Sequence, residues 1–312
     1  MALAGLAATE LFRQPACLLL ILGSNALIIL VPVLVAHQLG QTEHLAVDSS
    51  LAFTLVFGII LAGYAACSTL HNECRSGTIL IVFSKPVGRL LFFLAKAAAV
   101  SLMLAFFVYC SAAASLLAER LSPRNFEFDA TGSWLLLATP FTVLVPPAIL
   151  NFRTRRSFVP YSLAAFALTL TAWVLVLGAL DRDGHRAVFG SFIEWRILPA
   201  SLMEGFALLI MAAIALSLAT RLPTPTTVAI LAVILFAGLI SDHLVSQLPA
   251  PPFLQSGLRT ILPDIQAFWP ADKIGGGGVI TPPLLAHAAL YALTYGAGIM
   301  CLGYAAFRNR QF

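Results

Sequence analysis

The feature that most constrains this sequence is a series of strongly apolar stretches, each close to the length of a membrane-crossing helix. A helix that crosses the roughly 30 Å hydrocarbon core of a bilayer needs about 20 apolar residues, because it rises about 1.5 Å per residue. By this rule the sequence predicts about eight transmembrane helices, at residues 16–36, 51–70, 90–117, 134–150, 159–180, 201–220, 226–246 and 284–307. We therefore expect an all-α polytopic membrane protein whose residues 1–312 form a single transmembrane domain.

The composition supports this fold class and excludes two others. Of 312 residues, 60% are hydrophobic and only 10% are charged, whereas soluble domains are about 45–50% apolar and about 25% charged. So few charges cannot cover the surface of a soluble protein of this size. Soluble enzymes and nucleic-acid-binding proteins are therefore excluded. The five cysteines are scattered without a CxxC spacing, and we expect most of them to pack as inert core residues.

The basic residues predict how the chain is oriented, since Lys and Arg near helix ends are retained on the cytoplasmic side. With the N-terminus inside, the segments on that side hold only Glu10 and Glu73 as acids, but most of the basic residues: Arg13, Arg75, Lys85, Arg89, Lys96, Arg153, Arg155, Arg156, Arg221, Arg308 and Arg310. An even number of spans returns the C-terminus to the same side. The sequence thus predicts a multi-pass membrane protein with both termini cytoplasmic and residues 247–283 forming an outer loop.

The connection at residues 71–89 is polar at its start, has an apolar run at 79–83 that is too short to span, and ends in a Ser-Lys-Pro-Val-Gly-Arg turn. Such a segment must lie along the inner face of the membrane. On physical grounds alone it is an interfacial segment whose basic ends hold acidic headgroups.

The same connection carries an ordered set of residues: Glu73, Gly77, Thr78, Ser84, Lys85, Pro86 and Arg89. Three other stretches accompany it, at residues 9–13 before the first span, 216–225 before the penultimate span, and 262–268 together with 307–310 near the C-terminus. In order and spacing these stretches resemble the membrane (permease) subunits of type-2 ABC transporters. The C-terminal third resembles the permeases that serve nitrous-oxide-reductase maturation.

The resemblance implies a permease subunit in a bacterial inner (plasma) membrane that couples ATP hydrolysis by a separate ATPase to export or to another envelope process. Residues 1–15 would form an amphipathic elbow helix with Glu10 and Arg13. Residues 71–89 would form the ATPase-coupling segment, through Glu73, Arg75, Gly77, Thr78, Ser84, Lys85, Pro86 and Arg89. The implied partners are an ABC ATPase, which would hold ATP and Mg, a second copy or paralogue of the permease, and membrane lipids. Members of the family usually have six spans, so residues 134–180 are interpreted as an inserted helix pair.

The chain itself carries no GxxxxGK[ST] motif, so we expect no nucleotide-binding site of its own, no enzyme activity, no bound cofactor and no metal. One alternative is a polytopic membrane enzyme, for instance a lipid-modifying transferase. Its candidate residues would lie in the outer loops: Glu127, Asp129, Asp181, Asp183 and His185. Another alternative is a membrane anchor that docks an ATPase without transporting anything.

Lys96 and Glu204 are ionisable residues near the ends of predicted spans, and the Asp242-His243 pair lies at the outer end of the seventh span. Lys96 and Glu204 are close enough to a span end that we expect their side chains to reach the interface, which would leave the interior of the bundle almost uncharged. The span at 134–150 contains Pro140, Pro146 and Pro147, which remove backbone hydrogen bonds. We therefore expect it to be kinked and packed against other helices.

Overall fold

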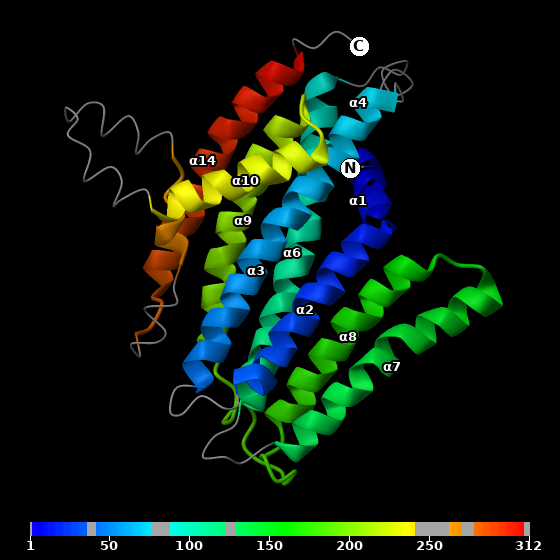
Figure 1. Cartoon of the computed structure of the whole chain (residues 1–312), viewed down its shortest axis with the longest axis vertical. Coiled ribbons are helices and arrows are strands. Elements are labelled where there is room, and N and C mark those ends of the chain that lie inside the picture. Colours follow the sequence, from blue (N-terminus) through cyan, green and yellow to red (C-terminus); the bar gives the residue numbers. More distant parts are fainter. Residues whose placement is uncertain are drawn as a thin grey trace.

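The computed structural model describes residues 2–35, 42–76, 88–122, 129–240, 262–269 and 278–308, and within these ranges it is a bundle of helices without a β-sheet (Figure 1). The elements are α1 (Ala2–Phe12), α2 (Pro15–Val35), α3 (Thr42–Ala66), a π-helical turn (Cys67–His71), α4 (Asn72–Ser76), α6 (Arg89–Leu121), α7 (Ala130–Thr154), α8 (Phe158–Gly178), α9 (Ile197–Ala219), α10 (Thr224–Leu239), a 3-10 turn (Gln266–Phe268) and α14 (Pro282–Arg308). The predicted all-α membrane fold is confirmed.

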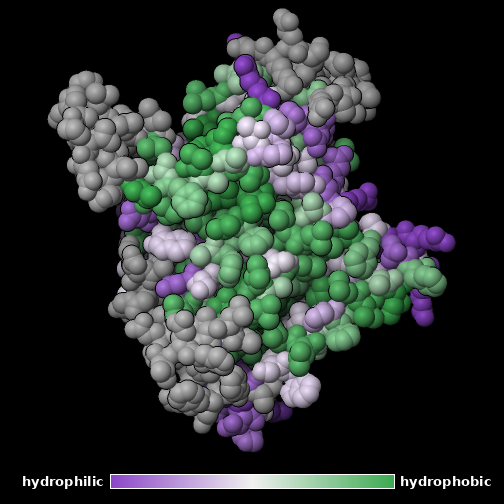
Figure 2. All heavy atoms as spheres, in the orientation of Figure 1, coloured by the Kyte–Doolittle hydropathy of each residue, from purple (hydrophilic) through white to green (hydrophobic). Residues whose placement is uncertain are grey.

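Among the described residues, seven helices are long and apolar enough to cross a membrane: α2, α3 with its extension, α6, α7, α8, α9 and α14. The eighth predicted span, 226–246, begins on α10, which has only 16 residues. α10 lies obliquely across α3 and α9 (Figure 1). Apolar atoms cover most of the visible face, and hydrophilic atoms lie mainly at the top, at the bottom, along the left edge and at the projecting tip on the right (Figure 2). This distribution is the one expected for a protein surrounded by lipid.

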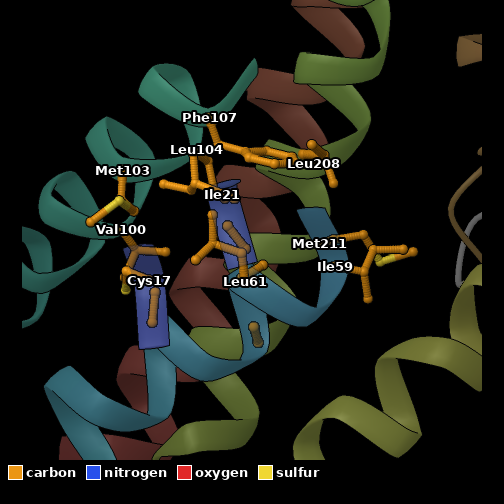
Figure 3. Close-up of a cluster of buried hydrophobic side chains, with 14 of the residues drawn as sticks. Cys17, Ile21, Ile59, Leu61, Val100, Met103, Leu104, Phe107, Leu208 and Met211 are labelled. Carbon is orange, nitrogen blue, oxygen red and sulfur yellow. The ribbon is translucent and has the colours of Figure 1, made fainter. Parts of the chain in front are cut away.

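The core of the bundle is formed by α2, α3, α6 and α9, which contribute the buried side chains in Figure 3. α14 packs along α9, and the α7–α8 hairpin lies on the side of α2 and α6. In a bilayer, helices associate by close van der Waals packing, which small residues at the contact allow. Gly58 of α3 has the Leu208 side chain of α9 directly over it, and Gly303 of α14 lies against Ser217 of α9. The Ser217 hydroxyl also donates to the Ile299 carbonyl at 3.1 Å.

The bundle has two distinct ends. α1, α4, the start of α6 and the end of α14 lie together at one end (Figure 1). There the Arg89 guanidinium donates to the Arg308 carbonyl at 2.7 Å. The opposite end holds the start of α7 and the end of α8. The start of α1 and the end of α14 therefore lie at the same end of the bundle (Figure 1).

The prediction that the 134–150 span packs against the other helices is wrong for most of its surface. α7 is a single helix of 25 residues with Pro140, Pro146 and Pro147 inside it, and few of its side chains are buried. It packs mainly on α8, and the hairpin leans away from the rest of the bundle (Figure 1). Apolar side chains on its outer faces allow this, because lipid can cover them as well as protein can.

Candidate functional site: the end of the bundle with α1 and α4

α3 does not stop at its last α-helical turn but continues through the π-helical turn, Cys67–His71, into α4. The Asn72 N–H bonds to the Cys67 carbonyl five residues back, which is the hydrogen-bond pattern of a π-bulge. The Cys67 sulfur also lies 3.3 Å from the Thr227 hydroxyl oxygen. The helical path from α3 to α4 is therefore continuous, and the turn is held against α10.

An ionic cluster joins α4 to two other helices. The Lys96 ammonium of α6 donates to the Glu73 carboxylate of α4 and lies 3.9 Å from the Glu10 carboxylate of α1. It also lies 5.4 Å from the centre of the Phe92 ring. Only 7% of the Lys96 side chain is exposed, against 52% for Glu10. We call Glu10, Glu73 and Lys96 the Lys96 cluster.

The expectation that Lys96 extends to the interface is wrong. Its side chain stays inside the protein because α1 and α4 bring two carboxylates to it. An unpaired buried ammonium group is costly, whereas one with a charge-assisted hydrogen bond is retained. Sequence reasoning placed Glu10 and Glu73 at this end but missed their common partner. The sequence feature that could have revealed this partner is a lysine within an apolar helix, because such a residue is a candidate functional residue by default.

The remaining predicted residues have different positions. Arg13 is exposed at the end of α1, and Arg89 begins α6, where it contacts α14. The backbone of Arg75 is part of α4. The rest of the predicted coupling residues lie outside the described residues: Gly77, Thr78, Ser84, Lys85 and Pro86. The structure thus brings Glu10 and Glu73 together and places Arg89 beside the end of α14.

Aromatic rings fasten α14 to this end of the bundle. Phe307, which is fully buried, packs on Phe92 and Phe93 of α6 with ring centres 6.0 and 5.8 Å apart. Phe12 of α1 meets Phe106 of α6 edge to face at 5.3 Å. Such pairs add to the free energy of apolar burial. α6 is therefore the element to which α1, α4 and α14 are all attached.

At the opposite end, a second buried ion pair holds the α7–α8 hairpin. Arg120 of α6 donates to the Asp129 carboxylate at 3.0 Å, to the Leu177 carbonyl, and to the Leu180 carbonyl at 3.0 Å. Asp129 also caps α7 by accepting from the Gly132 N–H at 2.7 Å. One guanidinium thus joins the end of α6, the start of α7 and the end of α8, whose last carbonyls lack partners within the helix.

These contacts bear on the residues considered for a membrane enzyme. Asp129 is fully buried and engaged as a counter-ion and helix cap, so its carboxylate is not presented to a substrate. Asp181 accepts from the Arg182 N–H at 2.7 Å within its own loop. Asp183 and His185 are exposed in that loop. Glu127 lies outside the described residues.

Glu204 is also buried, contrary to the expectation that it reaches the interface. Only 1% of the residue is exposed, and neither carboxylate oxygen has a hydrogen-bond partner among the described residues. Glu204 lies one turn before Leu208, the residue that covers Gly58 of α3. Residues four apart share a face of a helix, so Glu204 is directed toward α3. The interior of the bundle therefore does contain ionisable groups.

No family model matches this chain, and no curated protein matches it either. In the part of the chain that the structure describes, no three His, Cys, Asp or Glu side chains lie close enough together to hold a metal ion. The fold defines an α-helical, polytopic membrane protein.

Proposed function

We propose that this chain is the permease subunit of a type-2 ABC transporter and that α4, with the residues after it, receives force from a separate ATPase. The observation that carries the proposal is the Lys96 cluster. It joins the two segments that resemble the elbow helix and the coupling segment of that family. It does so at the end of the bundle where α14 also ends (Figure 1).

The cluster provides a mechanical route from α4 into the bundle. A force on α4 acts on α3 directly, because the two form one continuous helical path. It acts on α6 through the Glu73–Lys96 ion pair and on α1 through Glu10. Hydrogen bonds between charged groups are about twice as strong as neutral ones, which suits a joint that must transmit force. In this proposal Glu73 positions the coupling segment, and it is not itself the contact with the ATPase.

The test is ATP turnover by the complex, purified through a tag on this chain together with its ATPase and reconstituted in liposomes. Glu73→Gln and Lys96→Gln each remove one partner of a contact worth about 1.5–3 kcal/mol. We expect both variants to retain the bound ATPase but to lower the turnover that the permease stimulates. The exchanged pair Glu73→Lys with Lys96→Glu should recover only the part that depends on the Glu73–Lys96 pair, because the carboxylate placed at position 96 would face Glu10.

A matched control is Glu194→Gln, which removes a half-exposed ion pair with Arg196 elsewhere in the chain (3.3 Å) and should leave turnover unchanged. Full stimulated turnover in both single variants would contradict the proposed coupling route. Robust ATP hydrolysis by the isolated chain would contradict the subunit assignment itself. A membrane anchor without transport activity would bind the ATPase, but ATP would move no candidate substrate across the liposome membrane.

A further inference from the structure

The α7–α8 hairpin concentrates all of its charge at one point. Between Ala130 and Leu180 the sequence contains no Asp, Glu or Lys, and its only charged residues are Arg153, Arg155 and Arg156. All three lie at the tip, where residues 151–157 are exposed. α7 starts at the end of the bundle opposite α1 and carries the tip back toward the end that holds α1 (Figure 1).

The tip is a turn whose backbone is held by hydrogen bonds. Arg155 adopts the left-handed conformation that ends α7, with φ of 55°, and its N–H bonds to the Asn151 carbonyl at 2.9 Å. The Asn151 side-chain amide donates to the Arg156 carbonyl, and the Arg156 guanidinium donates to the Tyr161 hydroxyl at 3.1 Å. These bonds fix the backbone from which the arginines project. Arg153 and Arg155 make no side-chain hydrogen bond or ion pair with any described residue.

The surroundings of the tip indicate lipid. Phe152, beside the arginines, is 87% exposed, and α7 below it presents Trp134, Phe141 and other large apolar side chains outward. Figure 2 shows hydrophilic atoms at the projecting tip next to apolar ones. A helix of 25 residues is about 37 Å long, which exceeds the roughly 30 Å hydrocarbon core. Arginine side chains extend toward the headgroups, so arginines at the end of such a helix can contact lipid phosphates even though α7 is inclined (Figure 1).

We propose that the hairpin tip is a binding site for the phosphate-bearing headgroups of anionic phospholipids. Guanidinium groups match phosphate oxygens with two parallel hydrogen bonds, and three of them occur here in four residues without a neighbouring acid. Phe152 and the exposed face of α7 would lie along the acyl chains of the same lipids. Lipid binding at this site would hold the free end of the hairpin at one leaflet of the membrane. This inference does not depend on the proposed transporter function.

The experiment measures lipid binding to the purified full chain by native mass spectrometry, with phosphatidylglycerol and phosphatidylcholine as probes. The variant is Arg153→Gln/Arg155→Gln/Arg156→Gln. A basic residue near an anionic surface contributes about a 5-fold gain in binding. In the triple variant, the preference for phosphatidylglycerol over phosphatidylcholine should therefore fall by up to about 100-fold. The corresponding triple lysine variant should keep the charge-dependent part of that preference.

A control with the same loss of charge is Arg186→Gln/Arg221→Gln/Arg308→Gln, three exposed arginines elsewhere in the chain, which should keep the preference. Soluble glycerol phosphate should not displace the lipid, because it lacks acyl chains to lie on α7. The proposal is overturned if the tip variant binds phosphatidylglycerol like the wild type, or if the control loses as much. It is equally overturned if glycerol phosphate competes, or if the tip variant loses an acidic protein partner while lipid binding is unchanged.

Discussion

The contact that should matter most for stability is the one that Arg120 makes at the far end of the bundle. Arg120 and Asp129 are both buried, with 1% and 0% of their side chains exposed. The substitution Arg120→Met keeps an apolar chain of similar length and removes the guanidinium. It leaves the Asp129 carboxylate without a counter-ion and removes the guanidinium donor of the Leu180 carbonyl, whereas the Leu177 carbonyl keeps the backbone N–H of Leu180.

The expected cost follows from these contacts. Removing one partner of a buried ion pair costs about 3–5 kcal/mol, because the remaining charge stays desolvated. Asp129→Asn should cost less, about 1–3 kcal/mol, because Asn is as good a helix cap as Asp and Arg120 keeps its two carbonyls. In the double variant neither charge remains. Its cost should therefore be at least about 2 kcal/mol below the sum of the two single costs.

The assay is equilibrium unfolding of the purified chain in mixed micelles, with all four proteins of the cycle measured together. A cost below about 1 kcal/mol for Arg120→Met would show that the guanidinium does not hold the hairpin. Strict additivity in the cycle would show that the two charges do not interact. Either result would refute the physical account of this end of the bundle.

Three other predictions follow from the same structure. Glu204→Leu should raise the free energy of unfolding in micelles by about 1–3 kcal/mol, since it removes a buried carboxyl without a hydrogen-bond partner; a destabilised variant would show that Glu204 has a partner that this conformation lacks. Gly303→Val should lower the free energy of unfolding by about 1–3 kcal/mol, because a side chain at position 303 collides with Ser217 of α9. Unchanged stability would mean that α14 does not pack this closely on α9. Reporters inserted near Thr154 and fused after Phe312 should report the same side of the membrane, because the hairpin tip and the end of α14 point the same way; opposite sides would contradict the arrangement in Figure 1.

The sequence by itself determined the fold class and the approximate positions of the helices. This was predictable because a helix satisfies its own backbone hydrogen bonds, so an apolar stretch of sufficient length becomes a membrane-crossing helix wherever its neighbours lie. The sequence also indicated the segments at the α1 and α4 end through Glu10 and Glu73. It misjudged α7, because an apolar helix can be covered equally well by lipid or by protein.

Only the tertiary structure decided which side chains meet. Lys96 and Glu204 have similar positions relative to their span ends, yet the first gains two carboxylates and the second has no partner among the described residues. Arg120 finds its acceptors at the start of α7 and at the end of α8, which no spacing in the sequence reveals. The reason is that the hydrogen bonds of a helix are local, whereas the face that a helix turns inward depends on packing against all of its neighbours.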